Sequence, residues 1–228
     1  MKISIGVLTA SALLHRKFVQ SIMSLIYPSG VESNINILEG YQIPFARNRA
    51  VKNALKNNSD YLFFIDSDMV FPSDTLKRLL AHNVDIVNVL AFRRIEPHYP
   101  CIFDWNEENK CYITSDYSKK PGGLMKVDAC GMPCILIKMD VFKKMSEPWY
   151  YYRDNLFSSD LTFCENAKKA GFDINVDTSL KVGHIGEEKV INEEYYLKHL
   201  SPESKKEWNE NMKFNLRKVR EKENSPRE

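Results

Sequence analysis

The N-terminal part of the chain alternates between short apolar runs and segments with helical spacing, and this alternation constrains the fold more than any other feature. Runs rich in Val, Ile, Leu and Phe predict strands at residues 3–10, 34–40, 61–66 and 85–92. Helices are expected between them, at residues 15–27, 44–58 and 72–83. This order predicts an α/β fold with a mostly parallel sheet covered by helices on both faces. Such sheets bind ligands beyond the carboxyl ends of their strands.

The second part of the chain breaks this rhythm. Its pattern predicts a hairpin at residues 101–114, strands and a helix start within 125–145, a helix at 158–172 that Gly171 ends, and short strands at 173–177 and 180–186. From about Asn192 the chain is strongly charged and has helical spacing. We therefore expect one domain at residues 1–190 and a charged helical C-terminal extension at residues 191–228. That extension is either a solvated appendage or a docking element, for example in a homo-oligomer.

Composition and charge exclude some classes of protein. The 228 residues include 32 Lys and Arg against 30 Asp and Glu, a balance that does not favour nucleic-acid binding. The five cysteines are odd in number and irregularly spaced, which is typical of reduced thiols and predicts a cytoplasmic protein. No segment has the roughly 18 consecutive apolar residues of a membrane span. The first residues mimic a short signal peptide, but Thr9 and Ser11 favour a buried strand followed by a helix.

The third predicted strand ends in two acids, in the sequence YLFFIDSDM. Asp66 and Asp68 are two residues apart, so in an extended chain their side chains point the same way. Carboxylates at a strand end provide hard oxygen ligands for Mn²⁺ or Mg²⁺. A diphosphate is the usual partner of such a cation, since the metal offsets its charge and stabilises a departing nucleotide. The motif therefore predicts a divalent-cation site at the edge of the sheet.

Four motifs, in order, resemble those of GT-A-type glycosyltransferases of the family-2-like class. They are FARNRAV at residues 45–51, FFIDSDM at 63–69, DACGMPCILIKMDVFKKM at 128–145, and SSDLTFCENAKKAGFDI at 158–174 followed by VGHIG. The resemblance covers roughly residues 3–186. It implies the mixed, Rossmann-like GT-A sheet and a donor that is a UDP- or GDP-sugar. The acceptor is left open among glycan, protein, lipid and nucleic acid.

The resemblance also implies roles for residues on the donor side. Thr9 and Ser11 follow the first strand, where the base and ribose would bind. Arg47 would reach the base or the diphosphate, because a guanidinium matches phosphate geometry. Asp66 would hold the ribose or a metal-bound water. Gly131 would leave room for the sugar or the acceptor.

Metal binding and catalysis are implied for three further residues. Asp68 would bind Mn²⁺ or Mg²⁺ directly, with Asp66 beside it, and His184 would be a second ligand from far along the chain. Asp160 would be the base that takes the proton from the acceptor hydroxyl as it attacks the anomeric carbon. Direct attack of this kind inverts the anomeric centre. The family's Gln-X-X-Arg-Trp motif of processive synthases is absent, which favours a single addition.

The chain departs from the family pattern at one site residue. Its Glu-Asp pair is Ser159-Asp160 here, so the position of the base is kept and its neighbour is not. If Asp160 is not the base, a retaining reaction stays open. Asp160 is also placed where an acid stabilises the first turn of a helix, so its sequence position alone does not establish a catalytic role.

Two alternatives come from other classes of protein. FFIDSDMV fits the signature of haloacid-dehalogenase-type phosphatases, with Asp66 as nucleophile, Asp68 as general acid and Mg²⁺ as cofactor. Asp173 and Asp177 have the spacing of that family's later acidic motif, although its signature strand normally comes first in the chain. The other alternative is a non-catalytic protein that binds a nucleotide-sugar.

Two polar or aromatic segments have both a functional and a structural interpretation. Arg93 and Arg94 follow the fourth predicted strand and either contact phosphate or are solvated. The segment PWYYYRD at residues 148–154 precedes Asp160, and its aromatic rings either form a platform for a sugar or pack a loop on the core.

Overall fold

A computed structural model describes residues 1–11, 13–40, 42–119, 122–153, 158–186, 190–206 and 209–210. At its centre is a seven-stranded sheet with the order β2-β1-β3-β10-β5-β11-β8. These strands are β1 (Lys2–Thr9), β2 (Glu32–Glu39), β3 (Tyr61–Asp66), β5 (Ile86–Leu90), β8 (Leu124–Val127), β10 (Cys134–Lys138) and β11 (Ile174–Lys181). β10 and β8 run antiparallel to their neighbours, and the other five strands are parallel to one another. The carboxyl ends of β1 and β3 therefore meet at one edge.

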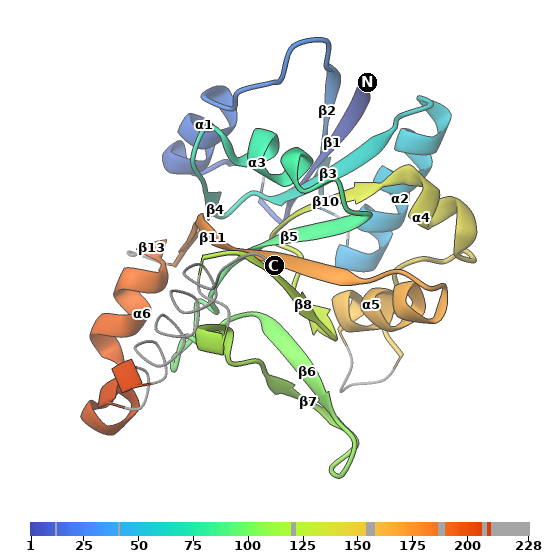
Figure 1. Ribbon diagram of the computed structural model, residues 1–228. Coiled ribbons are helices and arrows are strands. Elements are labelled where there is room, and N and C mark those ends of the chain that lie inside the picture. Colours follow the sequence, from blue (N-terminus) through green and yellow to red (C-terminus); the bar gives the residue numbers. More distant parts are fainter. Residues whose placement is uncertain are drawn as a thin grey trace, which may run out of the picture.

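Helices cover both faces of this sheet, as the alternating sequence predicts (Figure 1). On one face lie α1 (Arg16–Met23) and α3 (Thr75–Ala81), and on the other lie α2 (Ile43–Lys56), α4 (Met139–Lys144) and α5 (Ser159–Lys169). Successive side chains of β3 point alternately to the two faces of the sheet. Phe63 and Ile65 pack in the core beneath α1 and α3, and Phe64 packs with the core residues of α2 and α5. A strand buried on both faces explains why YLFFID is apolar almost throughout.

Two three-stranded sheets flank the main sheet. One joins β4 (Met69–Val70), β12 (Gly183–Ile185) and β13 (Val190–Ile191). The other joins β6 (Ile102–Asn106), β7 (Cys111–Thr114) and β9 (Ala129–Cys130), and its β6–β7 hairpin projects from the body of the molecule (Figure 1). A short 3₁₀ helix, η1 (Tyr117–Lys119), follows this hairpin.

Local details differ from the expectations at three places. Residues 174–181 form one strand, β11, whereas the sequence predicted two short strands at 173–177 and 180–186. A register shift against β5 accommodates the length of β11. The two-residue strands β4 and β13 were not expected, because runs this short carry no periodic signal. The helix expected from Pro72 begins at Thr75, after Asp74.

The C-terminal extension is described only in part. Helix α6 (Glu193–His199) begins after Asn192, whose side chain accepts a hydrogen bond from the Tyr195 N–H, and residues 211–228 lie outside the described part of the chain. The domain boundary near residue 190 stays a prediction. Within the described residues, no helix has the length and apolar character needed to cross a bilayer. All five cysteines are free thiols.

Candidate active site

A cleft of about 460 Å³ lies at the carboxyl ends of β1 and β3. Predicted site residues that line it are Thr9, Ser11, Asp66, Asp68 and His184. Its apolar wall includes Leu38 at the end of β2 and Ile43 and Ala46 in the first turn of α2. The cleft therefore lies at the edge of the sheet where the sequence predicted a site.

The turn after β1 is held by its own hydroxyl groups. Oγ1 of Thr9 donates to the carbonyl of Ser11 at 2.8 Å, and the Ser11 N–H donates back to Thr9 Oγ1 at 3.2 Å. Oγ of Ser11 in turn accepts the Leu13 N–H at 3.1 Å. These bonds hold residues that line the cleft. A role of the two hydroxyls in binding base or ribose stays a prediction.

Asp68 and His184 lie side by side although 116 residues separate them. Nε2 of His184 is 3.2 Å from Oδ2 of Asp68. The pairing of β12 with β4, in which His184 is opposite Met69, creates this proximity, and the Ile185 N–H donates to the Asp68 carbonyl at 2.7 Å. A metal site formed by these two side chains requires this proximity.

The surroundings of His184 orient its imidazole ring. Nδ1 lies 2.9 Å from the carbonyl oxygen of Phe92, which can only accept, so Nδ1 carries a proton. The other nitrogen, Nε2, is thereby directed at the carboxylate of Asp68. Although burial opposes it, the hydrogen bond and charge of Asp68 raise the pKa of His184, and the same contact lowers the pKa of Asp68. The pair is therefore set up either as an ion pair or as two ligands of one cation.

The contacts of the two carboxylate oxygens of Asp68 indicate whether a cation fits this site. Oδ1 of Asp68 is buried and has no hydrogen-bond partner among the described residues, whereas Oδ2 contacts both His184 and Nη1 of Arg94, the latter at 3.2 Å. A buried carboxylate oxygen without a partner is costly unless a ligand completes it. Within the described chain, however, no group of three or more His, Cys, Asp or Glu side chains is arranged to hold a metal. Asp68 and His184 thus fit a divalent cation only if other ligands come from substrate or water.

Arg47 does not line the cleft, and its position was not anticipated. Its side chain is 2 % exposed, and both terminal nitrogens lie 3.3 Å from the carbonyl oxygen of Met132. The guanidinium lies 3.7 Å from Asp66 and 3.3 Å from Asp160. Below it, the ring of Phe64 provides an aromatic face with its centroid 5.3 Å away. Arg47 therefore links the acid at the cleft to the acid of α5.

Asp160 is fixed in the first turn of α5. Ser158 caps this helix and accepts the Leu161 N–H. Oδ2 of Asp160 accepts the backbone N–H of Met132 at 3.1 Å, and Oδ1 faces Nε of Arg47. The side chain is 20 % exposed, which leaves it accessible to a ligand from one side.

Gly131 lies where the backbone passes close to Cys101, the residue before β6. Its N–H donates to the Cys101 carbonyl at 2.9 Å, and its own carbonyl accepts from the Asn88 side chain at 2.5 Å. A Cβ at this position would lie 3.3 Å from Cβ of Cys101. A glycine here therefore allows close packing, and room for a sugar or acceptor stays a prediction.

Among the titratable groups of the cleft, Asp66 has the pKa that is raised most. Loss of hydration raises its pKa to about 7, while the charge of Arg47 acts in the opposite direction and those of Asp68 and Asp160 add to the rise. Asp66 and Asp160 thus share one buried cation, Arg47. Asp68 instead contacts the exposed Arg94 and His184. Such a site gains from further positive charge.

The chain was also compared with known proteins. No protein-family model matches it, and no curated protein does. Among solved structures, A197 from STIV superposes with a TM-score of 0.60 at 15% identity, over 86% of this chain and 92% of A197. TarS residues 1–349 from S. aureus, in complex with UDP-GlcNAc, gives a TM-score of 0.49 at 15% identity, over 95% of this chain and 72% of the other. The chain has a GT-A-like fold.

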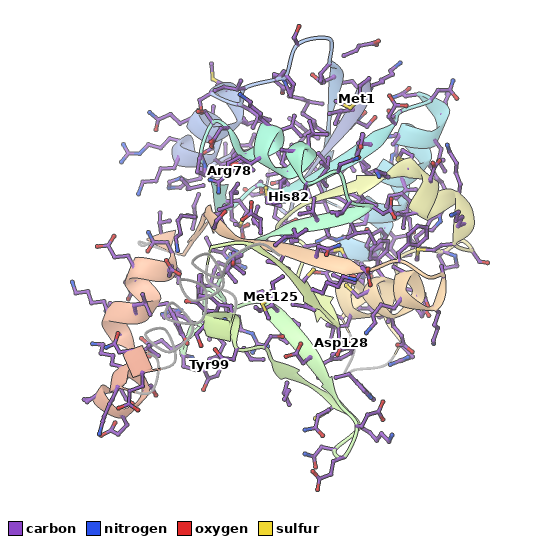
Figure 2. All side chains as sticks on the ribbon, viewed as in Figure 1. Met1, Arg78, His82, Tyr99, Met125 and Asp128 are labelled. Atoms are coloured by element: carbon purple, nitrogen blue, oxygen red, sulfur yellow. The ribbon has the colours of Figure 1, made fainter. Side chains whose placement is uncertain are left out.

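Within the GT-A-like fold, the two later acids of the phosphatase alternative, Asp173 and Asp177, lie apart from the cleft. Asp173 pairs with Lys126 at the surface. Asp177 is buried against Arg78 of α3 and His82, the residue that follows this helix; both are labelled in Figure 2. Neither lines the cleft that contains Asp66.

The aromatic residues before Asp160 were expected either to form a platform for a sugar or to pack a loop on the core, and they do not all have the same environment. Trp149 is buried and donates to the Phe142 carbonyl, and Tyr150 is buried and stacks on Phe163 with centroids 4.7 Å apart. Tyr152 is exposed. Core packing is therefore the role of the first two rings, and Asp154 lies outside the described residues.

Proposed function

We propose that the protein is a divalent-cation-dependent glycosyltransferase that moves a sugar from a UDP- or GDP-sugar to an acceptor hydroxyl. The observation that carries this proposal is the contact between Asp68 and His184 at the strand-end cleft. A carboxylate and an imidazole come together here from distant parts of the chain, and one carboxylate oxygen has no partner among the described residues. This arrangement matches the needs of a cation that also binds a diphosphate.

In this proposal the residues of the chain act as follows. Asp68 and His184 hold Mn²⁺ or Mg²⁺, which when bound supplies positive charge for the departing diphosphate. Thr9, Ser11 and the apolar wall of the cleft receive the nucleoside. Arg94, at the rim, adds a second cation on the phosphate side.

The acceptor side of the proposal centres on Asp160. The Met132 N–H and Arg47 orient its two oxygens, and a carboxylate fixed in this way can accept the proton of an attacking hydroxyl. Direct attack gives inversion at the anomeric carbon, and we propose one addition per encounter rather than processive synthesis. Arg47 then acts as a positioning residue, because its burial keeps it from the cleft.

A donor screen tests this function without knowledge of the acceptor. The protein is incubated with Mn²⁺ and a panel of UDP- and GDP-sugars, and nucleotide release by slow donor hydrolysis is measured. We expect release with at least one donor, a loss of about 100-fold or more in Asp68→Ala, and no change in Asp173→Ala, which removes a surface acid.

Two outcomes would support the alternatives instead. Phosphate release from phosphomonoesters without turnover of any nucleotide-sugar would favour a phosphatase. Tight binding of a nucleotide-sugar without hydrolysis or transfer would favour a non-catalytic binding protein. If Asp160→Asn keeps its rate of sugar transfer while its affinity for the donor falls sharply, Asp160 is not the catalytic base.

A further inference from the structure

A second cavity of about 460 Å³ lies between the β6–β7 hairpin and α5, and it shares no lining residue with the strand-end cleft. The hairpin contributes Trp105 and Tyr112, and α5 contributes Glu165 and Lys168. Asp128, labelled in Figure 2, lies beside both elements: one of its oxygens accepts the Trp105 N–H at 2.7 Å and the other pairs with Lys168. Asp128 therefore links the hairpin to α5 through one hydrogen bond and one ion pair.

Two aromatic rings form the apolar part of this cavity. Trp105 and Tyr112 are opposite each other in the hairpin, with ring centroids 5.1 Å apart and planes at 71°. Both side chains are only half-buried, so part of their ring surface remains available to a ligand. Ile113, the next residue, points to the other face of the hairpin. Aromatic walls with a few polar groups are typical of small-molecule sites.

The charged groups around these rings are balanced and already paired. Glu165 accepts from Arg153 at 2.6 Å and from Lys169 at 2.7 Å, and Asp128 pairs with Lys168. Together with Glu107, the described residues that line the cavity include three acids and three bases. Such a lining favours neither a polyanion nor a polycation. It offers both donors and acceptors, which is what a neutral ligand covered with hydroxyl groups needs.

We propose that this cavity is a saccharide-binding subsite for a glycan acceptor, with Trp105 and Tyr112 as the stacking surface. The inference rests on the proposed function and narrows the acceptor to a neutral glycan. Asp160 lies in the first turn of the helix that also lines the cavity, and Glu165 and Lys168 follow it by about 8 and 12 Å along the helix axis. A glycan whose reacting sugar is at Asp160 would place more distant sugars against the hairpin.

Binding of neutral trisaccharides tests the subsite directly. Linear trisaccharides of glucose, mannose, galactose and N-acetylglucosamine are tested as probes by saturation-transfer NMR, and the dissociation constant is measured by calorimetry. We expect at least one to bind in the millimolar range or tighter. Trp105→Ala should weaken it by about tenfold or more, and Glu165→Gln, on a different element, by about threefold or more.

Ile113→Ala is the matched control, since it removes an exposed apolar side chain from the same hairpin but the opposite face. It should leave the dissociation constant unchanged. Three results would overturn the subsite: no trisaccharide binds the wild-type protein, binding is indifferent to both Trp105→Ala and Glu165→Gln, or a charged peptide occupies the cavity in their place. Donor hydrolysis by the wild-type protein is measured separately. Its absence counts against the proposed function, whereas absence of saccharide binding counts against the subsite.

Discussion

Nε2 of His184 lies 3.2 Å from Oδ2 of Asp68, with the opposite ring nitrogen anchored on the carbonyl of Phe92. This contact joins the end of β3 to β12, and it exists because β4 and β12 pair. A backbone carbonyl that holds the far side of an imidazole is the usual support of a metal-ligating histidine. The following predictions start from this relationship.

Loss of the imidazole should weaken cation binding. We expect His184→Ala to bind Mn²⁺ about tenfold or more weakly than the wild type, because the variant lacks one of the two protein ligands that we propose for the cation. Electron paramagnetic resonance of free Mn²⁺ during a titration measures this affinity without any turnover. His199→Ala, which removes an exposed imidazole on α6, is the control. Equal Mn²⁺ affinity in all three proteins would show that His184 is not a ligand.

Arg94 should affect cation and nucleotide in opposite directions. Its side chain is 54 % exposed and contacts the same oxygen of Asp68 as His184 does. Arg94→Met removes a competing positive charge, so Mn²⁺ should bind a few-fold more tightly, consistent with about 1 kcal/mol or less for an exposed pair. Nucleoside diphosphates should bind more weakly in calorimetry. Arg93→Met, its exposed neighbour, is the control, and parallel changes in both affinities would contradict the expectation.

Arg47 should be needed for stability. The buried guanidinium neutralises Asp66 and Asp160, so Arg47→Met leaves both acids without their common cation. We expect the free energy of unfolding to fall by about 3–5 kcal/mol, measured by urea denaturation at pH 7. Lys52→Met, on the exposed side of the same helix, should change it by about 0.5 kcal/mol or less. A loss for Arg47→Met no larger than that of the control would mean the acids need no buried partner.

The features that could be predicted from the sequence are those that depend on residues close together in the chain. Tyr61–Asp66 was predicted with its observed bounds, because an uninterrupted apolar run that ends in acids is a local pattern. The burial of Arg47 could not be predicted, since an arginine near the start of a helix has the pattern of a solvated residue. Its environment comes from Met132 and Asp160, which are distant in sequence.

Backbone groups were the other limit on prediction. The Phe92 carbonyl orients His184 and the Met132 N–H orients Asp160, yet neither contribution depends on the identity of the residue. A main-chain donor or acceptor has no signature in the amino-acid sequence. The positions of His184 and Asp160 in the fold could be anticipated from the motifs, but the contacts that fix their orientation could not.

Acid should destabilise the protein through Asp177. This buried carboxylate accepts hydrogen bonds from the backbone and side chain of Ser179 and contacts His82 at 2.9 Å. Although burial opposes it, the hydrogen bonds from His82 and Ser179 lower the pKa of Asp177. A lowered pKa means that the stabilisation is complete above the unfolded-state pKa of about 3.9 and is lost as the pH falls below it. Urea denaturation between pH 7 and pH 3 should therefore show a steeper loss for the wild type than for Asp177→Asn. Parallel curves would rule out this contribution.

Gly183 should be required for the position of β12. A Cβ at residue 183 would overlap Cγ1 of Val190 on the paired strand β13, and the branched side chain of Val190 has little freedom to move away. Gly183→Ala should therefore displace β12, lower the free energy of unfolding by about 1–3 kcal/mol, and weaken Mn²⁺ binding because His184 is the next residue. Gly123→Ala is the control, since no atom of the described chain, its two sequence neighbours aside, lies within 4 Å of the added Cβ. If Gly183→Ala loses stability but keeps full Mn²⁺ affinity, the cation does not depend on where β12 holds His184.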